Sequence, residues 1–537
     1  MTDATAGPEI AGVDHAPSNT AETGPMLAAD GTPLKRSLAR ALRREKLRAL
    51  GLIAPLLIFV LVTFIAPIAD MLFRSVENDI VADTIPRTVL AVQDWDYTSA
   101  ATPGEDVFAA LYVDMFEAQE FKTHTRLGTR LNYETTGVSS LFRKSGRGVT
   151  RFDTDAYTDA FQALDTAWSD PLIWQEIVMA PGAAALLPET VSAWASWERI
   201  VGANEDDIAA ETPEDFLYTT LYRDLSRVGA DISSYDGPRA DLLARAAEAV
   251  GGFEPVSLVE QFTDIDEDWA DPAVWGTIKS FSSQYTSGYF LSAIDMKLTP
   301  TGVVAQPENL QVYILLFQRT LVMSLIIMGA CILLGYPVAY LLATLRMRVS
   351  NLLMILVLLP FWTSLLVRTS SWKVLLQQQG VVNDTLVWLG MVADDGRLEL
   401  INNQTGTIIA MTHILLPFMI LPLYSVMQTI PPSYVRAAKS LGATNWTAFW
   451  RVYFPQSVPG IGAGCILVFI LAIGYYITPE LVGGRTGIFI SNRIAFHIST
   501  SLNWGLAAAL GTILLVAVLI LYWVYDRIVG IDNVSLG

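Results

Sequence analysis

Long apolar stretches alternate with charged ones along the second half of the chain, and one more apolar stretch precedes them near the start. A helix needs about 20 apolar residues to cross the hydrocarbon core of a bilayer. Six stretches are long enough and free of charge over most of their length. We predict membrane-spanning helices near residues 49–70, 319–343, 352–370, 406–428, 457–480 and 503–526. The pattern therefore predicts an all-α membrane protein with six transmembrane helices.

Residues 74–310, between the first and second predicted spans, have a different composition. They hold 39 Asp and Glu against 16 Lys and Arg, a net charge of −23, whereas the chain of 537 residues as a whole has −18. Helical patterns recur near residues 105–120, 189–202, 213–229 and 238–250. We therefore expect a water-exposed, mainly α-helical insertion, and its acidic balance argues against nucleic acid as a partner.

The basic residues predict how the chain crosses the membrane. Residues 35–73 begin with seven Lys and Arg against one acidic residue, Glu45, and continue into the first span. Because basic residues favour the cytoplasmic side, six spans place both termini in the cytoplasm and the insertion outside it. Residues 1–34 contain little apolar content and predict a disordered cytoplasmic tail. Residues 531–537 are expected to form a second, short cytoplasmic tail.

Two stretches inside the insertion repeat each other. FQALDTAWSDPLIWQEI begins at Phe161 and FTDIDEDWADPAVWGTI at Phe262, with seven of 17 positions identical. In each stretch an aspartate, Asp170 or Asp271, precedes a proline, which supplies a helix cap and a first-turn residue. The tryptophans on both sides can pack that helix start into a core. We predict a duplicated helical unit, with a helix-start motif that arose by chance as the alternative.

A short cationic segment, YVRAAKSLGATNWTAFWRVYFPQSVPG, separates the fourth and fifth predicted spans. Pro431 and Pro432 should end the fourth span. Ser433 can then cap a helix over residues 434–441, which Gly442 ends in a left-handed conformation.

A second short helix should follow this turn. Thr444 or Asn445 can cap it, and Pro455 is expected to stop or kink it before the fifth span. The segment therefore predicts a helix, a sharp turn and a second helix at the cytoplasmic surface.

The spacing Ala-Ala-x3-Gly-x9-Val-x-Phe-Pro in this segment resembles the EAA loop of binding-protein-dependent ABC importer permeases. Arg436 stands where that family usually has Glu, so the charge pairing of this segment can differ from the family's. In the family the segment docks on a separate ATPase subunit. The resemblance assigns ATPase coupling to Arg436, Ala437, Ala438, Leu441, Gly442, Val452, Phe454 and Pro455.

Four further motifs extend the resemblance over residues 311–530. They are GYPVAYLLA (335–343), LPFWTSLLVRTSSW (359–372), LPFMILPLYSVM (416–427) and LVGG (481–484). They are similar to the subgroup that imports polyamines, opines, aminoethylphosphonate and ferric iron, and most similar to its polyamine branch. The resemblance implies an inner-membrane permease that works by alternating access. Its implied partners are ATP-binding ABC subunits, a second permease subunit and an extracytoplasmic substrate-binding protein, besides membrane lipid.

Polar and aromatic residues within spans are costly in lipid and are therefore candidates for the translocation path. These residues are Trp362, Arg368, Tyr475, Tyr476 and Glu480. A cationic substrate would favour the carboxylate and the aromatic faces. The alternative is that Arg368 and Glu480 are interfacial anchors and the tyrosines part of an aromatic belt.

The sequence predicts a transporter subunit and not an enzyme. It contains no Gly-x4-Gly-Lys-Ser/Thr phosphate loop, and we identify no catalytic or metal-binding constellation and expect no cofactor. His413 and His497 stand alone, which favours hydrogen bonds between helices over a role as ligands. A membrane sensor with an external domain would explain the insertion but not six spans. An ion-coupled transporter would need inverted repeats and ionisable residues at mid-membrane, which the sequence does not display.

Overall fold

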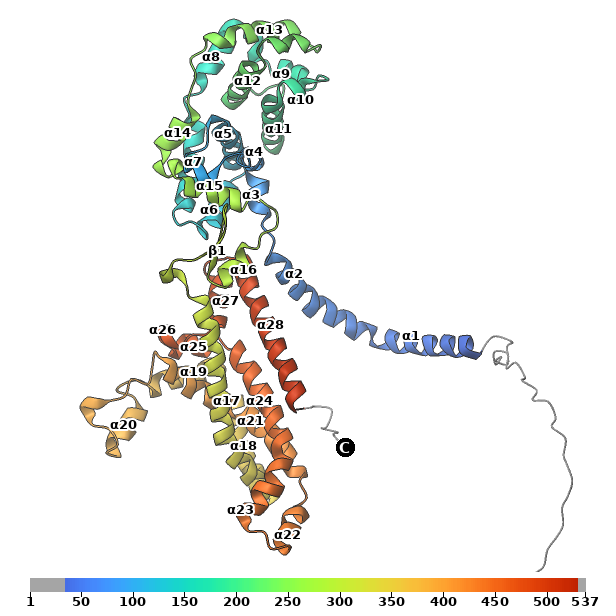
Figure 1. The fold of residues 1–537 in the computed structure, drawn as a ribbon, viewed down its shortest axis with the longest axis vertical. Helices are drawn as coiled ribbons and strands as arrows, with labels where there is room; N and C mark the ends of the chain where they lie inside the picture. The colour runs from blue at the N-terminus through green and yellow to red at the C-terminus, as the bar shows by residue number, and fades with distance from the viewer. Residues whose placement is uncertain (1–33, 530–537) are drawn as a thin grey trace, which may run out of the picture. The chain divides into compact units, whose positions relative to one another are not determined.

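The computed structural model describes residues 34–529, most of them helical (Figure 1). The tails predicted at residues 1–34 and 531–537 lie outside the described residues, apart from Leu34. Within the described part, the one sheet is a hairpin of two antiparallel strands, β1 (Met296–Thr299) and β2 (Gly302–Ala305). The fold therefore confirms a mainly helical protein.

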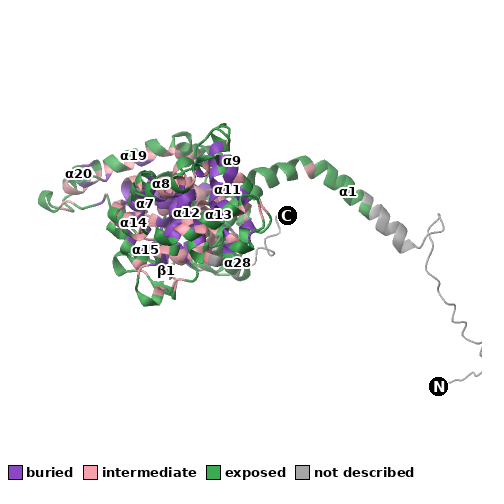
Figure 2. Ribbon diagram, turned by 90° about the horizontal axis from the view of Figure 1, so that it is seen from above, coloured by how far each residue is buried: buried purple, intermediate pink, exposed green. Residues whose placement is uncertain are grey.

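The chain divides into two compact units, residues 1–70 and residues 71–537. Helix α1 (Leu34–Val60), in the first unit, continues through a π-helical turn into α2 (Ala66–Arg74), within which the boundary between the units falls. The stretch Glu45–Arg74 is long and apolar enough to cross a membrane, and it carries no buried residue. In Figure 2 the described residues of α1 are coloured almost entirely as exposed. This helix contains the first predicted span.

Four long helices of the second unit form a bundle: α17 (Tyr313–Thr344), α21 (Gln404–Thr429), α24 (Phe454–Gly474) and α28 (Trp504–Val529). Helices α17, α21 and α24 pack against one another around a shared apolar core, and α28 contacts α24. Each of the four is, or is part of, a continuous helical stretch that is long and apolar enough to span a membrane. They correspond to four of the other predicted spans, although α24 ends at Gly474 and not at residue 480 as predicted.

The remaining predicted span, 352–370, is not one straight helix, and that expectation is corrected. Helix α18 (Met347–Leu358), extended by a short 3-10 turn, meets α19 (Leu365–Leu375) at an angle of 95°. Pro360 removes a backbone donor near the bend, and the side chain of Ser364 caps the new helix. By length and composition the described chain has five spanning helices, or six if this bent pair counts as one.

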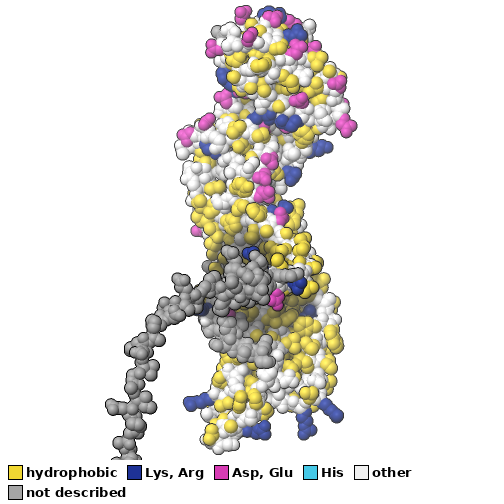
Figure 3. All heavy atoms as spheres, turned by 90° about the vertical axis from the view of Figure 1, so that its right-hand side faces the viewer, with side chains coloured by type: hydrophobic (Ala, Val, Ile, Leu, Met, Phe, Trp, Pro, Cys, Tyr) yellow, Lys and Arg dark blue, Asp and Glu magenta, His cyan; other side chains and the backbone are white. Residues whose placement is uncertain are grey.

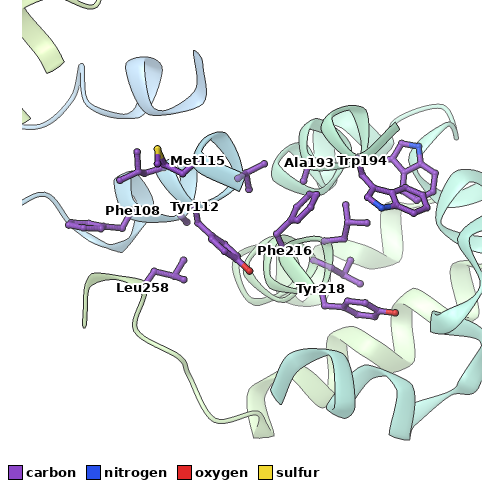
Figure 4. Close-up of a cluster of buried hydrophobic side chains, with 14 of the residues drawn as sticks. Phe108, Tyr112, Met115, Ala193, Trp194, Phe216, Tyr218 and Leu258 are labelled. Atoms are coloured by element: carbon purple, nitrogen blue, oxygen red, sulfur yellow. The ribbon is translucent and has the colours of Figure 1, made fainter. Parts of the chain in front are cut away.

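The insertion is a bundle of short helices around an aromatic core. Its helices are α3 (Asp79–Thr84), α4 (Pro86–Ala91), α5 (Glu105–Glu120), α6 (His124–Asn132), α7 (Val138–Gly148), α8 (Asp155–Leu164), α9 (Pro171–Val178), α10 (Ala183–Leu186), α11 (Pro188–Ala203), α12 (Asp215–Val228), α13 (Ala240–Ala249), α14 (Leu258–Ile265), α15 (Pro272–Ser280) and α16 (Gly288–Ala293). The helical patterns predicted from the sequence correspond to α5, α11, α12 and α13. Figure 4 shows Phe108 and Tyr112 of α5 in the same core region as Phe216 and Tyr218 of α12.

The two ends of the insertion lie side by side. The backbone N–H of Asn78 donates to the carbonyl of Gln284 at 2.8 Å, and that of Thr286 donates to Val76 at 2.8 Å. The chain therefore enters and leaves the insertion at one place.

The two repeated stretches adopt the same local structure. In the first, the indole of Trp174 donates to the carbonyl of Trp168 at 2.8 Å; in the second, Trp275 donates to Trp269 at 2.9 Å. In both, the predicted aspartate caps the following helix by accepting a backbone N–H, at 3.0 and 2.8 Å. Identical geometry at matching positions supports a duplicated unit over a chance motif.

Candidate functional site

The cationic segment between α21 and α24 forms the predicted helix and sharp turn. Helix α22 (Pro432–Ser440) is followed by a turn at Gly442, whose φ of +91° is the left-handed conformation predicted for it. The N–H of Ala443 donates across this turn to the carbonyl of Ala438 at 3.0 Å, which closes a typical helix end. Ser433 lies inside the helix and not at its cap, which corrects the predicted role, because helix α22 already begins at Pro432.

The second half of the segment departs from the prediction. Thr444 caps α23 (Asn445–Ala448) as expected, by accepting the N–H of Thr447 at 3.2 Å. The helix then continues without a stop through a π-helical turn, Phe449–Tyr453, into α24. Pro455 is therefore not a helix stop, because it occupies the first turn of α24, where the π-helical turn accommodates its missing N–H.

Exposure divides the predicted coupling residues into two groups. Leu441 is 90% exposed at the tip, Arg436 and Ala437 are also exposed, and Ala438 is half-buried. Val452 and Phe454 are half-buried at the base of the segment. The tip can therefore contact a partner, while the base fixes the segment to the bundle.

Two features near α22 and α23 support the predicted contact with a partner. Trp446, 72% exposed, lies close in sequence to Leu441 and was not singled out, because a tryptophan near a span also suits an interfacial anchor. Figure 3 shows Lys and Arg side chains gathered at the end of the molecule that carries α22 and α23, and Asp and Glu over the insertion. The basic residues of this end are Arg346, Arg348, Arg436, Lys439 and Arg451.

Only some of the predicted path residues come together. Tyr476 and Glu480 line one cavity of about 480 Å³, together with Arg485, Arg493 and Phe496. Glu480 lies on α25 (Ile477–Val482), after α24 has ended, and not within the fifth span as predicted. The cavity thus combines one carboxylate, two guanidinium groups and two aromatic faces.

Asn492, which the sequence did not single out, holds this cavity in shape. Its amide donates to a carboxylate oxygen of Glu480 at 2.6 Å and to the carbonyl of Tyr476 at 2.9 Å. Its own carbonyl accepts the N–H of Phe489, at the start of α27 (Ile490–Ser499). Asn492 is buried and therefore orients both predicted path residues from one fixed point.

The other path candidates lie outside this cavity. Trp362 is 76% exposed at the bend between α18 and α19, and Arg368 is half-buried on α19. Tyr475 is half-buried, and its carbonyl accepts a hydrogen bond from Ser491 at 2.7 Å. A hydrogen bond of 3.1 Å between the hydroxyls of Thr369 and Thr478 joins α19 to α25.

Both histidines make the predicted hydrogen bonds between elements. Nδ1 of His413 accepts from the indole of Trp372 at 3.0 Å. His497 lies 2.9 Å from the hydroxyl of Tyr313 and 2.8 Å from the hydroxyl of Ser501. Among the described residues no group of His, Cys, Asp and Glu is arranged to hold a metal ion.

Comparison with known proteins matches residues 332–530 to the family described as "Binding-protein-dependent transport system inner membrane component". The spermidine/putrescine transport system permease protein PotB of Escherichia coli (strain K12) is 36% identical over 215 residues, 40% of this chain and 78% of the relative. The inner membrane ABC transporter permease protein YdcU of the same strain is 30% identical over 279 residues, 48% of this chain and 87% of the relative.

More distant similarities have the same general character. The molybdenum transport system permease protein ModB of Mycobacterium bovis is 26% identical over 216 residues, 40% of this chain and 78% of the relative. A crystal structure of a bacterial alginate ABC transporter is 20% identical, covers 40% of this chain and 77% of its own, and has a TM-score of 0.34. That structural overlap is too slight to support an argument.

Proposed function

Because the chain belongs to the family of binding-protein-dependent inner-membrane transport components, we propose that it carries polyamines, of the spermidine and putrescine class, through an ATP-driven importer. It is a multi-pass inner-membrane permease subunit and not an enzyme. The observation that carries the proposal of ATP coupling is the turn at Gly442, which presents α22 and the exposed Leu441 at the basic end of the bundle.

This turn suits a separate ATPase subunit as its partner. The exposed tip offers an apolar side chain, Leu441, beside the small residue Ala437, so that a groove on a partner can approach the backbone closely. The half-buried base, with Phe454 5.8 Å from the ring of Tyr336 on α17, connects the tip to the bundle. Movement of the ATPase subunits would then rotate α24 and alternate the access of the path.

The cavity beside α25 is the proposed polyamine contact. The carboxylate of Glu480 is exposed to the cavity and can pair with an ammonium group, while Tyr476 and Phe496 offer aromatic faces. The name of the relative PotB agrees with this substrate class.

A second candidate substrate is a solute with an anionic phosphonate group, such as the zwitterion aminoethylphosphonate. Arg485 and Arg493 line the same cavity, and guanidinium groups bind phosphonate oxygens well. These guanidinium groups repel a polycation, whereas the phosphonate end of aminoethylphosphonate can pair with them.

The remaining partners complete the proposed importer. We place a second permease subunit against the bundle and an extracytoplasmic substrate-binding protein at the insertion, with both termini of this chain in the cytoplasm. The insertion, acidic and located between the first two spans, would dock or orient the binding protein at the mouth of the path.

Uptake by proteoliposomes that contain the chain with its two ATPase subunits, its second permease and its binding protein tests the proposal. We expect ATP-dependent uptake of labelled spermidine, with a higher half-saturating concentration in Glu480→Gln. Glu399→Gln, an exposed carboxylate outside the cavity, is the matched control. Uptake of aminoethylphosphonate that is weakened by Arg493→Gln would favour the second candidate, and uptake without ATP would contradict both.

A further inference from the structure

The two halves of the insertion are joined by reciprocal ion pairs. Lys144 on α7 pairs with Asp266 at 2.6 Å, and Arg245 on α13 pairs with Asp165 at 2.8 Å. Lys144 and Arg245 are 101 residues apart, as are Asp165 and Asp266, so each basic residue pairs with the acidic residue of the opposite half. The halves therefore exchange contacts in both directions.

Aromatic residues of the core also pack between the two halves. Phe108 on α5 packs edge-on against Trp275 of the second half, with ring centroids 4.8 Å apart. Tyr218 on α12 packs edge-on against Trp174 of the first half, at 5.0 Å. Because each half supplies part of the other half's core, the insertion is one intertwined body, and local packing cannot loosen in one half alone.

Where the first half has helix α6, between α5 and α7, the second half has only a short 3-10 turn, Gly229–Ser234. Asp114 on α5 and Asp224 on α12, which make matching hydrogen bonds to threonines, are 110 residues apart, whereas Lys144 and Arg245 are 101 apart. The second half therefore lacks nine residues between these positions, which is the length of α6. Duplication does not account for α6, so its contacts point to a separate role.

Helix α6 and the residue after it connect the insertion to the membrane bundle. Arg130, 6% exposed, lies between the rings of Phe281 and Tyr289, its guanidinium carbon 4.8 and 4.5 Å from their centroids. Tyr133 donates its hydroxyl hydrogen to the carbonyl of Ser501, in the turn before α28. Arg130 thus supports Tyr289, whose ring packs on α28, while Tyr133 bonds the turn before α28 directly.

The other end of the insertion makes two more contacts with the bundle. The ring of Tyr289 packs so closely on Gly505 of α28 that a Cβ at Gly505 would lie 2.3 Å from it. The carboxylate of Asp295 accepts three backbone N–H groups at the start of α17, at 2.8 to 3.0 Å. Asp295 has a φ of +58°, a conformation that surrounding contacts must hold.

Helix α27 leads from these contacts to the cavity. His497 near its end is hydrogen-bonded to Tyr313 of α17 and to Ser501, the residue that Tyr133 contacts. Asn492 on the same helix holds Glu480. A displacement of this short helix therefore acts on both the insertion and the cavity.

We propose that Tyr133, Tyr289 and Asp295 form a fixed joint, through which a protein docked on the insertion shifts α27 and repositions Glu480, an inference that rests on the permease function proposed above. Tyr133 and Tyr289 are positioning residues in this scheme and do not contact the substrate. The insertion is a lever rigidly attached to α17, α27 and α28, and not a tethered domain.

Hydrogen–deuterium exchange measures how rigid the joint is without substrate. The full chain is used, assembled with its partner subunits in lipid nanodiscs. Gly505→Ala places a methyl group against Tyr289, whereas Gly511→Ala, on the same helix, adds a methyl group with nothing within 4 Å. We expect faster exchange in residues 286–296 and 497–506 together for Gly505→Ala, and unchanged exchange for Gly511→Ala.

The stimulation of ATP hydrolysis by the loaded binding protein measures how well the insertion transmits docking to the rest of the permease. Tyr133→Phe removes only the hydroxyl that contacts Ser501, and Tyr285→Phe, at a ring 70% exposed on the insertion, is its control. We expect the stimulation to fall about fivefold or more in Tyr133→Phe and Gly505→Ala. Basal hydrolysis and the two control variants should stay unchanged.

The outcomes separate this inference from the proposed function. Faster exchange in Gly505→Ala with full stimulation would show a tether and overturn the lever. Faster exchange in one of the two segments but not the other would overturn the fixed joint. The chain could transport neither polyamines nor phosphonates and still show faster exchange in both segments for Gly505→Ala and reduced stimulation for Tyr133→Phe. That result would overturn the proposed substrate and support the lever.

Discussion

The indole nitrogen of Trp269 donates a hydrogen bond of 2.8 Å to the hydroxyl of Ser145. The matching Trp168 has a buried indole nitrogen without a partner, because Ala246 stands where the other half has Ser145. Ser145→Ala would leave a second indole N–H unsatisfied and should lower the stability of the insertion by about 1–3 kcal/mol. Thermal unfolding followed by tryptophan fluorescence measures this, with the exposed Ser140→Ala as control.

Ala246→Ser should act in the opposite direction. A hydroxyl at this position can accept from Trp168 as Ser145 does from Trp269, which should add about 1 kcal/mol. Equal melting temperatures for wild type, Ser145→Ala and Ala246→Ser would contradict the assigned pairing of the two halves.

The insertion should lose stability as the pH rises toward 6. Burial raises the pKa of Asp114 and of Asp224 to about 6, from an ordinary value of 3.8. Their protonated forms favour the folded state, so this contribution is fully present below pH 3.8 and is lost as the pH rises through 6. Melting temperatures between pH 4 and pH 7 test it.

The matched variant for the pH series is Asp114→Asn with Asp224→Asn. Other carboxyl groups of the insertion titrate in the same range, so the difference between wild type and variant is the quantity to compare. We expect a smaller decline in the variant, because its amides do not titrate. Parallel declines would show that Asp114 and Asp224 are ionised throughout.

Gly442→Val should uncouple ATP hydrolysis from transport while the protein remains in the membrane. A β-branched residue at a φ of +91° costs on the order of 1–2 kcal/mol and changes the direction in which α22 points. Gly442→Asn should be tolerated better, because asparagine adopts the left-handed conformation more readily. Normal transport by Gly442→Val would refute the role of the left-handed turn.

Ala438→Glu should weaken the attachment of the ATPase subunit. Ala438 is half-buried next to the turn, where a longer, charged side chain either projects into the docking face or disrupts the helix end. Co-purification of the ATPase subunit measures the effect, and Ala438→Ser is the conservative control. Undiminished recovery of the ATPase with Ala438→Glu would place this residue away from the interface.

Removal of the insertion should spare assembly but weaken transport at low substrate. The paired ends at Asn78 and Gln284 allow residues 79–282 to be replaced by a short glycine linker. We expect the shortened chain to retain its ATPase subunit and to require a higher concentration of loaded binding protein. Transport with unchanged affinity would leave the insertion without the docking role.

Much of the fold follows from local sequence patterns. Apolar runs long enough to span a membrane fix most spans, and the glycine between short helices fixes the turn at Gly442. The bend at Ser364 was missed, because the surrounding apolar run is long enough for a straight span and hides the cap. The sequence predicts that Pro455 stops or kinks the helix, because the π-helical turn that lets the helix continue leaves no clear signal in the sequence.

The candidate cavity was predictable only in part. Glu480 and Tyr476 stand out because they are costly in lipid, whereas Asn492 and Phe496 acquire a role only when α27 folds next to α25. The repeated tryptophan motif indicated a duplication. It could not indicate that each half packs against the other, since both arrangements satisfy the same motif.

The contacts between the two halves of the insertion limit when it can fold during synthesis. The carbonyl of Trp168 accepts a hydrogen bond from Tyr218, which is synthesised 50 residues later. Asp266, the ion-pair partner of Lys144, is synthesised 122 residues after it. At about 5–20 residues per second, that second interval lasts roughly 6–25 seconds. During it the first half exposes aromatic residues whose partners are not yet synthesised. We therefore expect the insertion to complete its native packing only after synthesis has passed α15.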